Sequence, residues 1–114
     1  MIDRRLSVLD LLAHPLDREL VAELLRGVID PELGVNIIDL GLVYGITIAT
    51  EGEVTIEMTL TTPGCPLGGY LDDQVRACLA PLPQVRAVAV SLVWEPPWDP
   101  AAMSAYAREQ LGWA

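Results

Sequence analysis

The stretch LVYGITIATEGEVTIEMTL, residues 42–60, determines the fold class of this chain. Its apolar residues alternate with polar or small ones in both halves, at Leu42, Tyr44, Ile46 and Ile48 and then at Val54, Ile56, Met58 and Leu60. Alternation of this kind is typical of a β-strand with one buried face. Thr50, Glu51 and Gly52 separate the halves and form a hairpin connection. The stretch therefore predicts two antiparallel strands in a sheet that is covered on one face only.

A helical pattern precedes this hairpin. Apolar residues recur with a period of about 3.6 over residues 20–28, which gives a helix one apolar face. Asp17 is suited to cap the N-terminus of the helix, because its carboxylate can accept a free backbone N–H. Gly27 and the pair Asp30-Pro31 are expected to end the helix, since a residue before proline is pushed out of the helical region.

The helical pattern returns after the hairpin, from Leu67 to the sequence APLP at residues 80–83. A third strand is predicted over residues 85–94, and Asp99 is expected to cap a last helix that ends at Gly112. The order is then helix, hairpin, helix, strand, helix. It predicts an α+β domain of two layers, in which helices cover one face of a small mixed three-stranded sheet.

The composition indicates one globular domain. At 114 residues, with 52% hydrophobic and 20% charged residues, the chain is long enough to bury its own core. Residues 16–114 are predicted to form this domain, after an amphipathic lead-in over residues 1–15. The lead-in has neither the pattern of a signal peptide nor the length of a membrane span, so we expect a cytoplasmic protein.

Charge and missing residue types exclude several functions. The formal net charge of −9 argues against nucleic acid or an anionic membrane as a partner, because phosphate binding needs clustered cations. The chain has no lysine, which excludes a Schiff-base amine and a P-loop. Its one histidine, His14, falls in the lead-in, so a histidine-rich metal site or a Ser-His-Asp triad would depend on that residue.

The stretch TTPGCP, residues 61–66, contains the most distinctive chemical group. Pro66 suits the first position of a helix, which makes Cys65 the N-cap. A thiol there lies beside free N–H groups and the positive end of the helix dipole, which lowers its pKa and favours the reactive thiolate. Alternatively, Cys65 is only a small residue tolerated in a loop. The other cysteine, Cys78, falls in an apolar helical stripe, and we expect it to be buried.

Two groups of polar residues accompany this thiol. Asp30, Glu32 and Asp39 lie in the loop before the hairpin, where they could form a metal or acid–base group. Acidic loop residues are, however, commonly caps and turn formers. Thr61 and Thr62 could donate hydrogen bonds to a sulfur or a ligand, or they could simply close the end of the strand. The residues alone leave these alternatives open.

Three separated motifs, DPELGVNIIDLGLVY, MTLTTPGCPLGGYL and PPWDPAAMSAYAREQLG, together resemble one family. This is the small iron–sulfur cluster assembly family that includes bacterial SufT, the cytosolic assembly factors of eukaryotes and the core of PaaD. The same domain is similar to the N-terminal part of some Mrp-type carrier ATPases. The resemblance extends from about Leu16 to Gly112. It implies maturation of iron–sulfur proteins rather than turnover of a small substrate.

The resemblance also implies a site. The family's cysteine falls on Cys65, which would transiently bind iron, a cluster or a partner's thiol. The family's acidic motifs fall on Asp30, Glu32 and Asp39, and its threonine falls on Thr61, so these side chains would surround the sulfur. One thiolate does not hold a cluster alone, because clusters are held by several cysteines. The missing ligands must come from a second copy of the chain, from another protein or from a small thiol. The implied partners are the iron–sulfur assembly machinery and client apo-proteins.

Two other functions remain open beside this accessory, non-enzymatic role. A thiol enzyme would use Cys65 as nucleophile and a nearby carboxylate as base, although it would lack a well-placed histidine. An adaptor would hold clients through the acidic loop and through the tryptophans and prolines near the C-terminal end, which include Trp94, Trp98 and Trp113. The same aromatic residues could instead pack a terminal helix against the domain.

Overall fold

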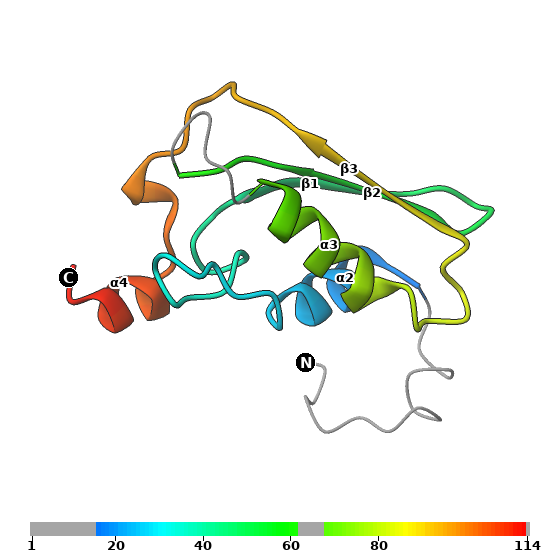
Figure 1. Cartoon of the computed structure of the whole chain (residues 1–114), viewed down its shortest axis with the longest axis horizontal. Coiled ribbons are helices and arrows are strands. Elements are labelled where there is room, and N and C mark those ends of the chain that lie inside the picture. Colours follow the sequence, from blue (N-terminus) through cyan, green and yellow to red (C-terminus); the bar gives the residue numbers. More distant parts are fainter. Residues whose placement is uncertain (1–15, 62–67, 114) are drawn as a thin grey trace.

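A computed structural model of the chain describes residues 16–61 and 68–113. The elements along the chain are α2 (Arg18–Leu25), β1 (Val43–Ile48), β2 (Glu53–Met58), α3 (Gly68–Leu79), β3 (Ala87–Leu92), the 3₁₀ turn η1 (Pro100–Ala102) and α4 (Ala105–Leu111) (Figure 1). This order confirms the prediction of helix, hairpin, helix, strand and helix. The predicted lead-in over residues 1–15 lies outside the described residues.

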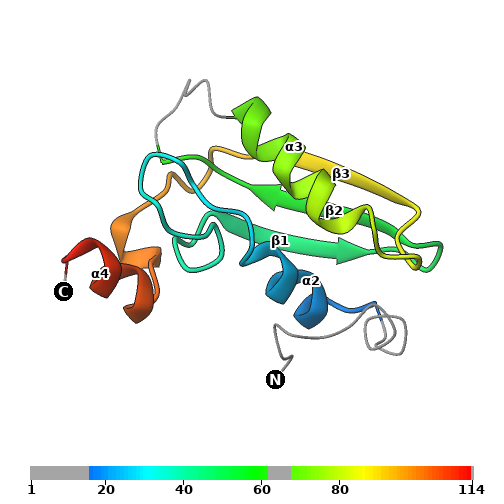
Figure 2. The same cartoon turned by 60° about the horizontal axis from the view of Figure 1, so that its bottom comes forward.

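The three strands form one mixed sheet in the order β1-β2-β3. β1 and β2 are the two antiparallel strands of the predicted hairpin, with Gly52 at a φ of 88° in the turn. β2 and β3 are parallel, since α3 connects them as a crossover. Seen from the helix side, α3 lies over β2 and β3 while α2 lies beside β1 (Figure 2). α2 and α3 therefore cover the same face of the sheet, as predicted.

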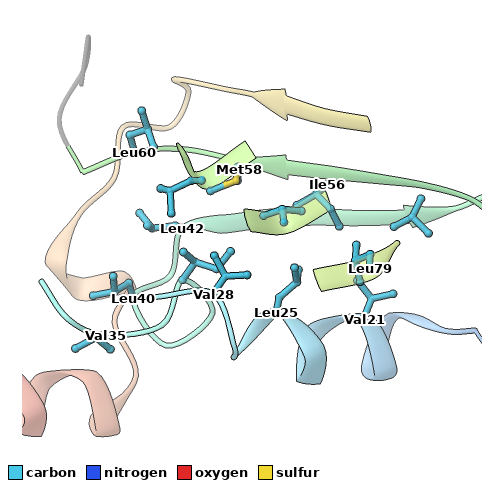
Figure 3. Close-up of a cluster of buried hydrophobic side chains, with 14 of the residues drawn as sticks. Val21, Leu25, Val28, Val35, Leu40, Leu42, Ile56, Met58, Leu60 and Leu79 are labelled. Carbon is cyan, nitrogen blue, oxygen red and sulfur yellow. The ribbon is translucent and has the colours of Figure 1, made fainter. Parts of the chain in front are cut away.

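The hydrophobic core fills the space between this face and the two helices (Figure 3). Every second residue of β2 is buried, and the exposed residues between them include Glu53 and Glu57. The main contributors from the three elements are Val54, Ile56 and Met58 of β2, Leu20, Val21 and Leu25 of α2, and Leu71, Val75 and Leu79 of α3. The periods of two and of about 3.6 in the sequence thus correspond to the faces that are buried.

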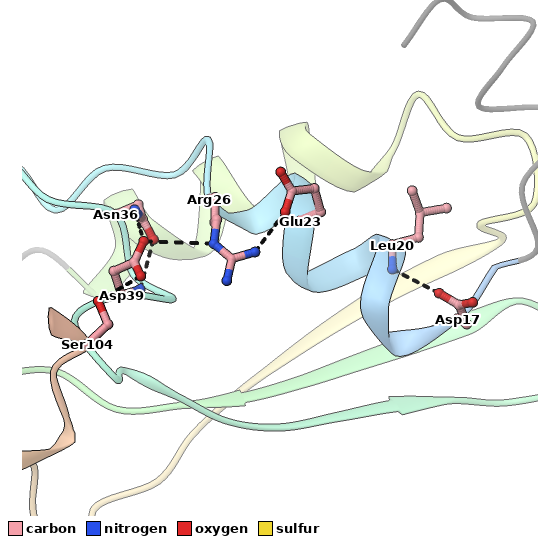
Figure 4. A network of polar contacts seen from close by, with 7 residues as sticks. All are labelled: Asp17, Leu20, Glu23, Arg26, Asn36, Asp39 and Ser104. Atoms are coloured by element: carbon pink, nitrogen blue, oxygen red, sulfur yellow. Dashed lines mark hydrogen bonds and ion pairs between the residues drawn. The ribbon is translucent and has the colours of Figure 1, made fainter. Parts of the chain in front are cut away.

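The ends of α2 follow from its neighbours. The carboxylate of Asp17 accepts a first-turn backbone N–H at 2.8 Å, which confirms the predicted N-cap (Figure 4). The helix ends at Leu25, two residues before the expected breaker Gly27. The Val28 carbonyl accepts the N–H of Ile37 at 3.0 Å, so the chain must leave the helix before it makes this bond.

The C-terminal helix has a different cap from the one predicted. Asp99 caps η1, whereas Ser104 caps α4, so the prediction that Asp99 caps the last helix is wrong. The reason is Met103, which is extended, with a φ of −69° and a ψ of 143°, and buries its side chain in the core. The extended residue interrupts the helical backbone between η1 and α4. α4 ends at Gly112 in the left-handed conformation, as predicted.

Candidate functional site

The predicted functional thiol of Cys65 lies outside the described residues, as does Thr62. The described chain gives the two ends of this segment, Thr61 after β2 and Gly68 at the start of α3. The role of Cys65 as an N-cap therefore stays a prediction. A Cβ on Gly68 would lie 3.5 Å from side-chain atoms of Leu60 and Leu92, so the start of α3 packs beside the ends of β2 and β3.

Asp30, the first carboxylate of the acidic loop, is buried and closes a turn. One of its carboxylate oxygens, Oδ1, accepts the backbone N–H groups of Glu32 at 2.8 Å and Leu33 at 3.1 Å. Its backbone carbonyl accepts the N–H of Gly34 at 2.7 Å. These contacts are those of an aspartate-initiated turn. The Glu32 side chain lies on the exposed surface of this turn.

Asp39, the last carboxylate of the loop, joins three parts of the chain (Figure 4). Its Oδ2 accepts a hydrogen bond from the Asn36 amide at 2.7 Å, and its Oδ1 accepts one from the Ser104 hydroxyl at 2.8 Å. The guanidinium of Arg26 lies 3.8 Å from Oδ2 and also pairs with Glu23 at 2.7 Å. The network ties the loop to the end of α2 and to the start of α4.

A metal site is not preformed within residues 16–61 and 68–113. No group of three or more histidine, cysteine, aspartate or glutamate side chains in these ranges could hold a metal ion. The carboxylates of Asp30 and Asp39 accept hydrogen bonds from backbone and side-chain groups of the fold, as caps and turn formers do. Thr61 is half-buried at the end of the β2 segment. A shell of these residues around the Cys65 sulfur stays a prediction.

The second cysteine, Cys78, is held in its protonated form. Cys78 is partly buried against the core, and its thiol donates a hydrogen bond to the Leu24 carbonyl at 2.9 Å. Burial raises the pKa of this thiol from 9.0 to about 11. It is therefore protonated at neutral pH, and protonated thiols are poor nucleophiles and metal ligands. Cys78 thus packs against the core as expected, but it is partly and not fully buried.

Sequence reasoning missed how the C-terminal segment supports the acidic loop. The indole N–H of Trp98 donates to the Leu40 carbonyl at 2.8 Å, and the Ser104 N–H donates to the Asp39 carbonyl at 2.8 Å. Trp98 is thus a packing residue, whereas Trp94 and Trp113 are 41% and 45% exposed. A serine directly before a helical pattern is a cap signature, which makes Ser104 a second candidate cap beside Asp99. Its contact with Asp39 has no local signal.

The fold and these motifs agree with the comparison to known proteins. Residues 18–92 match the family described as iron–sulfur cluster assembly protein. Because the match spans well over half of the chain, the chain belongs to this family, which confirms the resemblance of the three motifs.

Among similar proteins, the Fe-S protein maturation auxiliary factor SufT of Staphylococcus aureus (strain USA300) is 49% identical over 85 residues. This match covers 75% of the chain and 97% of the relative. The Fe-S protein maturation auxiliary factor YitW of Bacillus subtilis (strain 168) is 46% identical over 95 residues, covering 83% of the chain and 93% of YitW. A crystal structure of a domain of unknown function, DUF59, from Bacillus anthracis superimposes with a TM-score of 0.79 at 41% identity. It covers 82% of this chain and 90% of that one.

None of the helices within the described ranges is long and apolar enough to cross a membrane.

Proposed function

We propose that this chain is a cytoplasmic, non-enzymatic auxiliary factor in the maturation of iron–sulfur proteins. The observation that carries the proposal is its membership of the iron–sulfur cluster assembly family, with 49% identity to a relative named as a maturation factor. That relative is matched over 97% of its length, so the likeness concerns a whole small protein rather than one part of a larger one.

We propose further that Cys65 carries the chemistry, by transiently binding iron, a cluster or a partner's thiol. The state of the other cysteine supports this assignment, because the raised pKa and partial burial of Cys78 make it a poor ligand. Iron or a cluster is here a cargo, passed on rather than kept. Weak retention suits such a role, since a site with a single thiolate needs its remaining ligands from the donor or the recipient.

In this proposal the acidic loop and the threonines form the polar surroundings of the sulfur. Asp30 and Asp39 hold the loop in shape through the turn and the network described above, and Glu32 is the loop's exposed carboxylate. Thr61 and Thr62 would donate hydrogen bonds toward the thiolate or its cargo. The partners would be the assembly machinery and the apo-proteins that receive the cargo.

A complementation experiment tests this function. In cells lacking the gene for this chain, the activity of an iron–sulfur enzyme in extracts is compared after expression of the wild type, Cys65→Ser or Cys78→Ser. We expect the wild type and Cys78→Ser to restore the activity and Cys65→Ser to fail, at equal protein levels. Full restoration by Cys65→Ser would refute the role of the thiol. Failure of the wild type itself would refute the maturation function.

A further inference from the structure

Strand β3 lies at one edge of the sheet, and no other strand of the described ranges pairs with its outer side (Figures 1 and 2). Its pairing with β2 is regular over six consecutive residue pairs, from Glu53 with Ala87 to Met58 with Leu92. The opposite edge strand, β1, contains a register shift between Val43 and Gly45. Irregularities of that kind hinder the addition of another strand. β3 is therefore the edge that can accept one.

The register also identifies the free backbone groups of β3. The Val93 N–H donates to the Met58 carbonyl at 2.9 Å, while Met58 lies opposite Leu92. In a parallel ladder, the residues of one strand that bond to its neighbour alternate with residues that point away. The outward-pointing backbone groups are thus those of Val88, Val90 and Leu92, and among them the Val88 carbonyl already accepts a hydrogen bond from Arg76.

A groove of about 270 Å³ follows the first part of this edge. It is lined by Arg76, Ala80, Val85, Arg86, Ala87 and Val88. The guanidinium of Arg76 donates to the Val88 carbonyl, which agrees with the outward direction of that group. Arg76 also pairs with Asp72, whereas Arg86 forms no ion pair with any residue of the described chain.

Arg86 gives the groove one cation without an ion-pair partner in the described chain, although the chain as a whole carries a net charge of −9. The arginines of the described ranges are Arg18, Arg26, Arg76, Arg86 and Arg108. Two of them line this groove, and of these Arg76 is paired with Asp72 whereas Arg86 is not. A carboxylate placed here gains a favourable interaction, whereas association of two copies would oppose two strongly negative molecules. The charge therefore favours a foreign acidic segment over a second copy.

We propose that the β3 edge binds an extended segment of a partner protein that carries at least one carboxylate side chain. The segment adds as a fourth strand, exchanges main-chain hydrogen bonds with Val90 and Leu92, and directs its carboxylate to Arg86. The residues of β3 that face away from the helices are small, namely Ala87, Ala89 and Ser91, and leave that side open. This surface goes beyond the proposed maturation role and does not depend on Cys65.

The test uses random dodecapeptides displayed on phage and selected on the full chain. The enriched peptides are synthesised, and their dissociation constants are measured by calorimetry. We expect sequences that alternate β-branched residues with others and contain Asp or Glu. Arg86→Glu should weaken their binding at least about tenfold, whereas the control Arg18→Glu, which changes an exposed arginine that does not line the groove, should leave it unchanged.

A second pair of variants tests the backbone contacts. Val90→Pro removes an outward N–H without removing a bond to β2, and edge strands tolerate proline in such a position. Val90→Ala shortens the same side chain but keeps the N–H. Val90→Pro should weaken peptide binding at least about tenfold relative to Val90→Ala. Circular dichroism checks that both variants are folded. If Val90→Pro does not fold, Arg86→Glu still tests the proposal.

Three outcomes would overturn the proposal. One is that no peptide is enriched over a protein-free support. Another is that the enriched peptides bind with the same affinity to Arg86→Glu and to every folded variant at position 90. The third is a micromolar dimer in sedimentation experiments that Val90→Pro or Arg86→Glu dissociates, because the edge would then be occupied by a second copy.

Discussion

Ser104 connects the C-terminal helix to the acidic loop through one hydroxyl group. It accepts the Ala107 N–H at 3.2 Å as the cap of α4, and it donates to the Asp39 carboxylate at 2.8 Å. Ser104→Ala should therefore lower the free energy of unfolding by about 2–5 kcal/mol, the sum expected for a lost cap and a lost hydrogen bond to a charged group. Urea denaturation measures this change. The exposed Ser91 provides the control, and an effect of Ser104→Ala as small as that of Ser91→Ala would contradict the bridging role.

The partly buried thiol of Cys78 should make the free energy of unfolding depend on pH in the alkaline range. Its pKa is about 11 in the folded chain and 9.0 as the reference value, so folding favours the protonated form. The stabilisation is complete below pH 9 and is lost as the pH rises through 11, because only the unfolded chain then ionises freely. Urea midpoints between pH 8 and 11 should fall more steeply for the wild type than for Cys78→Ala. If the urea midpoints of the two proteins fall equally with pH, burial does not raise the pKa of the Cys78 thiol.

Much of this residue-level chemistry was accessible from the sequence. The Asp17 cap and the packing of Cys78 against the core follow from patterns within one helix each, and the turn at Asp30 follows from its neighbours. The bond between Asp39 and Ser104 joins residues 65 positions apart and arises only when the C-terminal segment folds back. Local patterns carry no information on such a contact.

At the scale of elements, two glycines should respond in opposite ways to the same substitution. Gly69 lies in the first turn of α3, and a Cβ there meets nothing within 4 Å. Gly69→Ala should raise the free energy of unfolding by about 0.5–1 kcal/mol, because alanine restricts the unfolded chain. Gly41 has a φ of 79°, and a Cβ there would lie 2.5 Å from the Ala102 carbonyl oxygen. Gly41→Ala should therefore destabilise the fold.

Thermal unfolding measures the melting temperatures of Gly69→Ala and Gly41→Ala against the wild type. A lower melting temperature for Gly69→Ala would mean that the start of α3 needs the freedom of glycine. An unchanged melting temperature for Gly41→Ala would mean that the acidic loop and η1 can move apart at little cost in free energy.

The hairpin and the two core helices were predictable because each has a strong internal period. The C-terminal segment was not, because residues 99–112 contain two cap signals and the sequence does not say which one starts the helix. The buried Met103 decides between them, and its burial depends on a core built by distant residues. The parallel pairing of β3 is likewise a consequence of the α3 crossover rather than of the strand's own sequence.

At the scale of the whole molecule, we assign roles to two parts of the chain. One is the chain segment with Cys65, between β2 and α3, to which we assign the handling of iron or a cluster. The other is the β3 edge with Arg86, to which we assign a partner's extended segment. Variants of one should leave the other intact, so Arg86→Glu should preserve any iron binding that requires Cys65. If iron binding and peptide binding respond to different variants, one assignment can fail without the other.

Anaerobic reconstitution with iron and sulfide tests the central claim most directly. After removal of unbound iron, the visible absorption of the wild type is compared with that of Cys65→Ala and of the matched control Cys78→Ala. The account predicts charge-transfer absorption in the wild type and in Cys78→Ala, and its loss in Cys65→Ala. A Cys65→Ala spectrum that equals the wild-type spectrum would contradict it.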